Sequence, residues 1–331
     1  MIRRLRGLTW LVMLLASGAL VGCVDSSGDT GRSPEARERG DARGSGRRDL
    51  DWGIYQIYWG RHYEEMLSRS VEPLASGPNF VMFYRDLGRG FPHRGCETIR
   101  SRGAVPIVSL ELWHWGAPEN YLPRINDGEF DTAFRDWARE ARDFGSPVYL
   151  RFGFEMNGDW FGWGGHPDLF VRAWRRARHI FQEEGASNVV WVWSPNAISI
   201  PREPWNQIDA YYPGDDVVDW VGLDGYNFGD HHSEWHRWES FEEVFGPALD
   251  LVARSHASKP VMIAEFGCAP GRPGQRASWI RDAHAYVLGR PEIRAAVWFS
   301  LDKSREGEPD WSFQGDPEAI TAFNETFARP R

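Results

Sequence analysis

Cysteine is scarce in this sequence of 331 residues, which contains Cys23, Cys96 and Cys268 and no other cysteine. The spacing of the three cysteines matches no metal-binding motif. We expect no bound cofactor and name no metal-ligating residue. A disulfide between Cys96 and Cys268 is one possibility, but we expect two free, buried thiols. The fold is therefore expected not to depend on disulfides.

The sequence also lacks an excess of positive charge and a glycine-rich phosphate loop. A net charge of −9 argues against a nucleic-acid-binding protein, because such proteins usually carry a basic face. A doubly wound open sheet would place a glycine-rich loop after its first strand, and residues 54–61 contain neither GxGxxG nor a Walker pattern. No repeat of the kind that builds a solenoid is visible.

Long hydrophobic runs are missing except near the N-terminus. Residues 1–6 carry three arginines and residues 8–21 are mostly apolar, a run too short for a comfortable membrane-spanning helix but typical of a signal peptide. It ends in Leu-Val-Gly-Cys23, which resembles a bacterial lipobox. That resemblance implies a lipoprotein signal peptide over residues 1–22 and lipid attachment to Cys23; an ordinary signal peptide or an uncleaved anchor is the alternative.

Residues 23–49 are rich in Ser, Gly, Arg, Asp and Glu and contain almost no large apolar side chains. Such a segment cannot bury a core, so we expect a disordered, flexible tether rather than an ordered polar cap. The expected protein is exported, lipid-anchored to a membrane of a bacterial cell envelope on its periplasmic or outer side, and monomeric.

From Trp52 onward, short apolar runs alternate with longer amphipathic ones. Eight runs are candidate strands: 54–58, 80–84, 105–113, 148–155, 189–194, 218–226, 261–266 and 295–301. Because these runs are apolar on both faces, they predict parallel strands covered by helices. The sequence therefore predicts an α/β fold with a single (β/α)8 TIM barrel over residues 50–331.

Helical periodicity supports the same fold. Apolar side chains recur at helical spacing in four segments between or after the strands: 131–144, 168–184, 275–288 and 317–327. Ser240 and Glu243 have the spacing of a capping box at the start of another helix. Pro247 predicts a kink or a restart of that helix.

Two glutamates, Glu155 and Glu265, lie at the ends of apolar candidate strands. In a (β/α)8 barrel, functional residues gather at the carboxyl ends of the strands. Two carboxyls about 5 Å apart there would suit retaining glycoside hydrolysis, and a wider gap would suit inversion. A structural ion pair with one of the many arginines is the alternative for each glutamate. The 18 tryptophans fit sugar binding, although we expect more than half of them to be structural.

Five blocks of sequence, in this order, resemble glycoside hydrolase family 26: RFGFEMNGDWFGWGG, VVWVWSPN, YYPGDDVVDWVGLDGYNFG, KPVMIAEFG and AVWFSLDK. The resemblance extends over roughly residues 52–327. It implies a (β/α)8 retaining glycosidase from a family that holds β-mannanases, mixed-linkage β-glucanases and some β-1,3-xylanases. The WSPN and DGYN blocks look closer to the lichenase-like members.

The resemblance also implies roles for individual residues. Glu155 matches the acid/base, Glu265 the nucleophile, and Tyr226 the tyrosine that hydrogen-bonds the nucleophile. The expected reaction is endo-acting hydrolysis of β-1,4-mannan or mixed-linkage β-1,3-1,4-glucan by double displacement, with a polysaccharide as partner. The expected substrate-binding residues are Trp113, Asn157, Trp160, Trp163, Tyr226 and Trp298, with Trp298 as the floor of the sugar site.

One position departs from the family pattern, which commonly has His immediately before the acid/base, where this sequence has Phe154. An apolar neighbour would tend to raise the pKa of Glu155 by desolvation. The departure leaves room for a catalytically inactive carbohydrate-binding surface lipoprotein of the same fold. A metal hydrolase is a third reading, but His232 and His236 do not form an HExxH motif.

Overall fold

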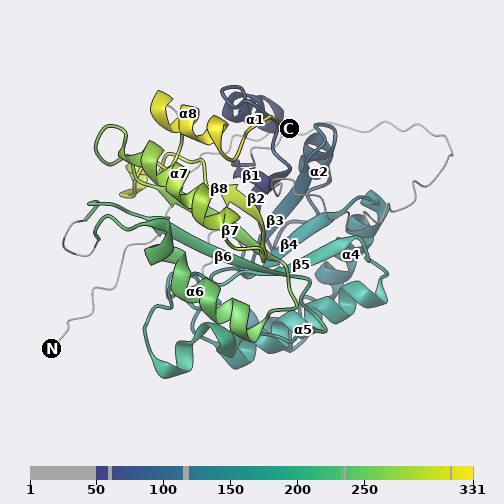
Figure 1. Cartoon of the computed structure of the whole chain (residues 1–331). Helices are drawn as coiled ribbons and strands as arrows, with labels where there is room; N and C mark the ends of the chain where they lie inside the picture. The colour runs from purple at the N-terminus through teal and green to yellow at the C-terminus, as the bar shows by residue number, and fades with distance from the viewer. Residues whose placement is uncertain are drawn as a thin grey trace. The chain divides into compact units, whose positions relative to one another are not determined.

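The computed structural model describes residues 50–58, 62–114, 119–232, 234, 236–313 and 315–330 (Figure 1). The predicted signal peptide, the predicted lipidation site Cys23 and the predicted tether lie outside the described residues. Within the described ranges, no helix combines the length and the apolarity needed to cross a bilayer.

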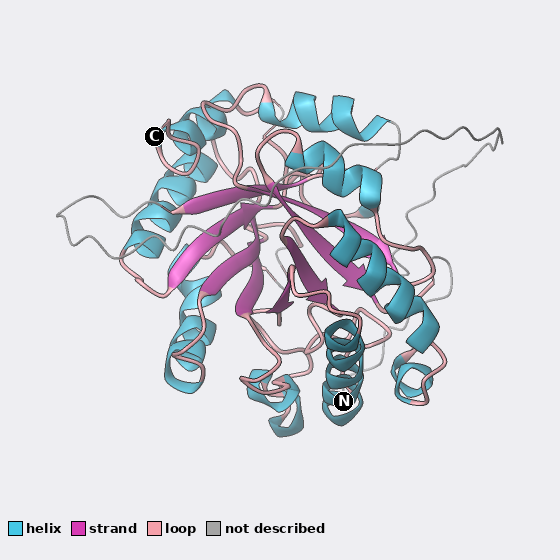
Figure 2. Ribbon diagram, turned by 90° about the vertical axis from the view of Figure 1, so that its right-hand side faces the viewer, coloured by secondary structure: helices cyan, strands magenta, loops and turns pink. Residues whose placement is uncertain are grey.

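Eight parallel strands form a closed barrel in sequence order, ringed by helices (Figure 2). Pairing of the first strand with the last closes the ring. The predicted fold class is confirmed, with every expected strand present and only its ends shifted. The strands are β1 (Asp51–Tyr55), β2 (Phe80–Asp86), β3 (Val105–Glu111), β4 (Val148–Phe152), β5 (Val189–Trp193), β6 (Trp220–Asn227), β7 (Val261–Cys268) and β8 (Ile293–Trp298).

Helices follow most of the strands and cover the outside of the barrel (Figure 1). They are α1 (Tyr63–Val71), α2 (His93–Arg100), α3 (Leu122–Asn126), α4 (Asp131–Phe144), α5 (Pro167–Glu183), α6 (Phe241–Ser255), α7 (Gln275–Leu288) and α8 (Pro317–Glu325). The connection from β5 to β6 instead carries two short 3-10 segments, η2 (Pro204–Asn206) and η3 (Ile208–Tyr211).

The predicted capping box at the start of α6 is confirmed. Glu243 N donates to Ser240 Oγ at 3.1 Å, and Ser240 N donates to the Glu243 carboxylate at 2.8 Å. Pro247 lies inside α6 without ending it, so the predicted restart does not occur. Apolar side chains such as Phe245 and Leu249 are buried on either side of Pro247, and this packing supports the helix where the proline removes a donor.

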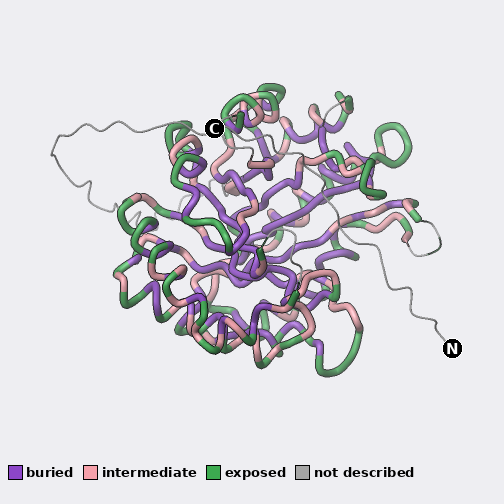
Figure 3. The backbone as a smooth tube through the Cα atoms, turned by 180° about the vertical axis from the view of Figure 1, so that it is seen from behind, coloured by how far each residue is buried: buried purple, intermediate pink, exposed green. Residues whose placement is uncertain are grey.

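Alternation along the strands divides the apolar side chains between two cores. On β2, Val81 and Phe83 pack outward against the helices, whereas Phe80 and Met82 face the barrel interior. The buried residues concentrate along the strands and the inner sides of the helices (Figure 3). Burying one such side chain contributes about 2 kcal/mol, so both cores stabilise the barrel.

A β-bulge in β7 turns Glu265 into the barrel. Ile263 pairs with Leu223 on β6, but the next pair is Glu265 with Asp224, so Ala264 is the extra residue. Ala264 faces the interior and Phe266 packs outward. Strict alternation would have pointed Glu265 at the helices, and the extra residue reverses its direction.

Cys96 and Cys268 are free and buried, as expected from the sequence. Burial raises the pKa of both thiols above the usual range. Both are therefore neutral packing residues rather than nucleophiles.

Candidate active site

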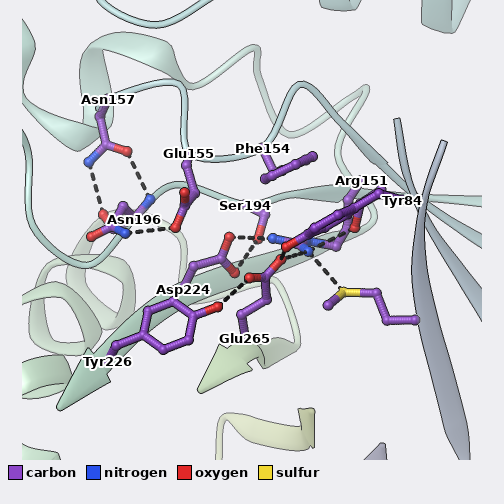
Figure 4. A network of polar contacts seen from close by, with 12 residues as sticks. Tyr84, Arg151, Phe154, Glu155, Asn157, Ser194, Asn196, Asp224, Tyr226 and Glu265 are labelled. Atoms are coloured by element: carbon purple, nitrogen blue, oxygen red, sulfur yellow. Dashed lines mark hydrogen bonds and ion pairs between the residues drawn. The ribbon is translucent and has the colours of Figure 1, made fainter. Parts of the chain in front are cut away.

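Glu265 lies at the carboxyl end of β7 and accepts hydrogen bonds from three side chains (Figure 4). Tyr84 and Arg151 donate to Oε1 at 2.9 and 2.5 Å, and Tyr226 donates to Oε2 at 2.5 Å. Burial raises the pKa of both tyrosines, so each hydroxyl keeps its proton and acts as a donor. The contact predicted for Tyr226 is therefore present.

Arg151 is fully buried and connects Glu265 to a second carboxylate, Asp224. Its guanidinium also donates to Ser109 at 2.8 Å and to Ser194 at 3.2 Å. Burial raises the pKa of Asp224, and the ion pair with Arg151 opposes that rise. One buried cation thus holds two carboxylates in fixed positions, an arrangement in which the loss of the cation would leave both uncompensated.

Glu155 follows β4 and is held by two neutral N–H donors. Asn196 Nδ2 donates to Oε1 and Trp160 Nε1 donates to Oε2, each at 2.7 Å. The backbone at Glu155 is left-handed, with φ of 51°, and its N–H donates to Ser194 O at 2.7 Å. This conformation costs a non-glycine residue roughly 1 kcal/mol or more. The hydrogen bonds around Glu155 hold the backbone in this conformation.

The two glutamates interact electrostatically across the barrel mouth. Burial, and then the charge of Glu265, raise the pKa of Glu155 to about 7, against the opposing effect of the donors Asn196 and Trp160. Glu265 instead has a cation and two hydroxyls directed at its oxygens. The two carboxyls therefore have different environments. That of Glu155 favours the protonated form, whereas Glu265 is surrounded by hydrogen-bond donors.

Trp160 is half-buried and reaches Glu155 because Gly158 gives it space. A Cβ at Gly158 would lie 2.3 Å from the Trp160 ring, so only glycine allows the indole to lie against the chain there. Among the four tryptophans predicted to bind substrate, Trp160 is the one that donates a hydrogen bond to Glu155 or Glu265.

Trp163 and Trp113 are packed away from open solvent. Trp163 is buried, donates to Phe154 O at 2.8 Å, and stacks on Phe161 with 4.4 Å between ring centres. Trp113 meets Trp163 edge to face at 5.0 Å and is partly buried. These rings form the support of the loop after Glu155 rather than an open platform.

The structure corrects two predicted substrate contacts. Trp298 is fully buried on the outer side of β8, where it stacks on Phe313 and donates to Trp311 O at 2.9 Å. Alternation instead points the next residue, Phe299, into the barrel, where it stacks on Tyr55 at 4.4 Å. An outward residue cannot form the floor of a sugar site at the barrel mouth, and the rings that face the interior next to it are those of Phe299 and Tyr55.

Asn157 is the second correction, because its side chain is fully used within the protein. Its Nδ2 donates to Asn196 O and Ser199 Oγ, and its Oδ1 accepts from Asn196 N at 2.8 Å. Asn157 is completely buried. It therefore holds the residue that binds Glu155 and does not itself face a substrate.

Three residues of the site were not predicted from the sequence: Tyr84, Arg151 and Asn196. Arg151 had a visible signal, since it is the one charged residue in an apolar candidate strand four positions before Glu155. Tyr84 and Asn196 had no comparable signal, because a tyrosine within a strand and an asparagine shortly after a strand are both common.

Phe154, the departure from the family pattern, is part of the same network. It is buried, stacks on Tyr84 with 5.1 Å between ring centres, and lies 4.9 Å from the Arg151 guanidinium carbon. The ring therefore packs against two of the three donors to Glu265. An apolar residue here supports the position of those donors.

A further pair of carboxyls lies on the neighbouring strands. Asp86 at the end of β2 is in register with Glu111 at the end of β3, and both are buried. Burial, and then the charge of Asp86, raise the pKa of Glu111 to about 8. Asp86 pairs with Arg89 at 2.9 Å.

Three histidines, His231, His232 and His236, lie in the connection after β6. His231 and His232 approach Gly307 O, and His236 Nδ1 lies 2.6 Å from His231 O. Across the described residues, no group of three or more His, Cys, Asp or Glu side chains is arranged to hold a metal ion.

Fold and site together define a (β/α)8 barrel protein with two buried glutamates at the carboxyl ends of β4 and β7. Residues 121–266 match the sequence model described as Glycosyl hydrolase family 26. Over these residues the chain is therefore similar to glycosyl hydrolase family 26.

The curated relatives are named for different polysaccharides. Endoglucanase H of Acetivibrio thermocellus is 31% identical over 273 residues, covering 80% of this chain and 28% of the relative. Beta-1,3-xylanase TXYA of a Vibrio species is 33% identical over 148 residues, 44% of this chain and 28% of the relative. Mannan endo-1,4-beta-mannosidase A and B of Caldalkalibacillus mannanilyticus is 32% identical over 160 residues, 40% of this chain and 30% of the relative. The chain spans less than a third of the length of each.

Solved structures share the fold. A GH26 beta-mannanase from Bacteroides ovatus aligns with a TM-score of 0.63 and 18% identity, covering 86% of this chain and 89% of that one. An endo-beta-1,4-mannanase from Cellulomonas fimi aligns with a TM-score of 0.63 and 18% identity, covering 85% and 70%.

Proposed function

We propose that the protein is a retaining, endo-acting β-glycosidase that hydrolyses a β-glycan by double displacement. The observation that carries the proposal is the difference between the two carboxyls. Glu265 accepts from Arg151 and two tyrosines, whereas Glu155 accepts only from neutral N–H groups and has a pKa raised to about 7. Glu265 suits a nucleophile and Glu155 suits an acid/base.

In the first step, an Oε atom of Glu265 bonds to the anomeric carbon while the glycosidic C–O bond breaks. Glu155 gives its proton to the departing oxygen. In the second step, Glu155 takes a proton from water, the water oxygen bonds to the anomeric carbon, and the bond to Glu265 breaks. Both carboxyls return to their starting state.

The substrate that we favour is a β-glucan with mixed 1,3 and 1,4 linkages, with β-1,4-mannan as the next candidate. Support comes from the extent of the similarity: the match to a relative named endoglucanase covers 80% of this chain, and the match to the mannosidase covers 40%. The relative named β-1,3-xylanase adds a third backbone to test.

A hydrolysis panel tests the proposal. The purified protein is incubated with barley mixed-linkage glucan, β-mannan, glucomannan, laminarin and β-1,3-xylan, and the products are sized. Cleavage of mixed-linkage glucan into a series of oligosaccharides is expected. Retained binding without cleavage of any polymer would contradict the enzyme and favour the carbohydrate-binding alternative.

Activity is expected to fall as the pH rises through about 7, because Glu155 must be protonated to act as the acid and the pKa of its carboxyl is raised to about 7. Above that value kcat/KM should drop by about tenfold per pH unit. The Trp160 N–H stabilises the ionised form of Glu155. The variant Trp160→Phe lacks this donor, so the pKa of Glu155 should rise and the drop in activity should move to higher pH.

The matched control for this measurement is Trp220→Phe, the same replacement at the start of β6, at the amino end of the barrel. Its pH profile should coincide with that of the wild type. An unshifted profile in Trp160→Phe, or a wild-type activity that rises between pH 7 and 9, would contradict the role of Glu155.

We also propose that the protein is exported and anchored to a membrane through a lipid on Cys23, on the strength of the N-terminal sequence alone. Expressed in a bacterium, the wild type should sediment with membranes and take up labelled fatty acid. Cys23→Ser should take up no label and leave the membrane fraction. Equal labelling of the two forms would exclude Cys23 as the site.

A further inference from the structure

Trp205 differs from the other tryptophans of the described residues. Its relative exposure is 49%, and it is the one large hydrophobic side chain in the described ranges that is exposed. It belongs to η2, in the connection between β5 and β6. An indole left in water forgoes the stabilisation that burial would provide, so its position calls for a physical reason.

The segment that carries Trp205 is firmly held. The next residue, Asn206, is completely buried and donates from Nδ2 to Asn157 O and to Pro201 O, both at 2.9 Å. Its Oδ1 accepts a hydrogen bond from the hydroxyl of Tyr211. The exposed indole is therefore mounted on an anchored turn, and little conformational freedom of the backbone remains to be lost when a ligand binds.

The same contacts place Trp205 beside the loop of the acid/base. A Cβ at Gly165 would lie 3.8 Å from Cη2 of Trp205, and Gly165 N donates to Met156 O at 3.0 Å. Asn206 bonds the carbonyl of Asn157, two residues after Glu155. Trp205 thus lies on the rim at the carboxyl ends of β4 and β5, next to the loop that carries Glu155.

We propose that Trp205 is an outer binding platform for a pyranose ring of the polysaccharide, at a distance from the ring that is cleaved. This inference rests on the proposed function. An aromatic face offers a flat apolar surface, which matches the C–H face of a pyranose. In this proposal, a polymer chain that extends from Glu155 along the rim contacts Trp205, whereas a short oligosaccharide bound at the two glutamates does not reach it.

The surroundings of Trp205 favour a sugar ring over a protein or a membrane. Its neighbours Arg202 and Glu203 are exposed and charged, and no further large apolar side chain in the described ranges extends the patch. Protein and membrane contacts need a contiguous apolar surface. A single indole between polar groups is large enough for one sugar ring.

The test compares Trp205→Ala with the conservative Trp205→Tyr and with Arg202→Ala, a matched change on the same turn that leaves the indole in place. We expect Trp205→Ala to raise KM for the cleaved polymer about tenfold. Its kcat should stay unchanged, and its hydrolysis of a short oligosaccharide should stay within about twofold of the wild type. Trp205→Tyr should restore most of the affinity, and Arg202→Ala should behave as the wild type.

Binding is measured separately, by electrophoresis through gels that contain each polymer, with Glu265→Ala as the background. Trp205→Ala in that background should lose most of the retardation. Equal retardation with and without the indole, or an equal loss on the short substrate, would overturn the platform. A protein whose retardation depends on Trp205 but which cleaves no polymer would instead contradict the proposed function and still support Trp205 as a binding platform.

Discussion

Glu265→Ala should lose turnover by on the order of 10⁴-fold or more while the protein stays folded. In the proposed mechanism, the substitution removes the atom that bonds to the anomeric carbon. Arg151, Tyr84 and Tyr226 lose their shared acceptor, but Asp224 still pairs with Arg151. The measurement is kcat on the preferred polymer, with the melting temperature as the check on folding.

Azide distinguishes a lost nucleophile from a lost acid. In Glu265→Ala, azide can enter the vacated space, bond to the anomeric carbon and give the α-glycosyl azide, with Glu155 still protonating the leaving oxygen. In Glu155→Ala, azide should intercept the glycosyl-enzyme from the opposite face and give the β-azide. The same azide from both variants, or activity retained by Glu265→Ala, would contradict the assignment of roles.

Arg151→Met should have the largest effect on stability of any change in the site. It leaves Asp224 and Glu265 buried without their cation, which costs about 3–5 kcal/mol. For a domain of this size that corresponds to a fall in melting temperature of about 10 °C. Turnover should fall as well, because Glu265 loses its charged donor.

The double variant Arg151→Met with Asp224→Asn separates buried charge from lost packing. Removing one of the two uncompensated carboxylates should recover part of the melting temperature but none of the activity. The matched control is Arg69→Met, which breaks an exposed ion pair with Glu65 and should leave the melting temperature unchanged. A double variant no more stable than Arg151→Met would mean that charge is not the cause.

The substitution of Phe154 for histidine is compatible with this network. Tyr84 stacks on Phe154 and donates to Glu265. The sequence suggested a loss of polarity at this position and a rise in the pKa of Glu155. The largest cause of the raised pKa of Glu155 is burial, followed by the charge of Glu265.

Several features could be predicted because they depend on local chemistry. Eight apolar runs separated by amphipathic segments have few ways to bury both faces, so the barrel followed from the pattern. Glu155 and Glu265 could be predicted from their position at the ends of candidate strands and from the resemblance of the surrounding blocks. The capping box at Ser240 required only two residues at a fixed spacing.

The direction of a side chain could not be predicted, because it depends on register and on neighbours far away in the chain. Trp298 matched a family motif yet faces the helices, since alternation along β8 places Phe299 inside. Asn157 lies two positions after Glu155 in the sequence, but its side chain hydrogen-bonds to the loop after β5. Trp205 is exposed on η2, and Asn206 holds η2 through a contact between residues 49 positions apart.

The sequence by itself determined the barrel, the two catalytic candidates and the likeness to glycosyl hydrolase family 26, because periodicity and short motifs are local properties. Only the tertiary structure decided which donors surround each carboxyl, which aromatic rings face a substrate and which are core. The extra residue Ala264 in β7 illustrates the reason. One inserted position, visible only when β6 and β7 are paired, turns Glu265 from the helices toward Arg151.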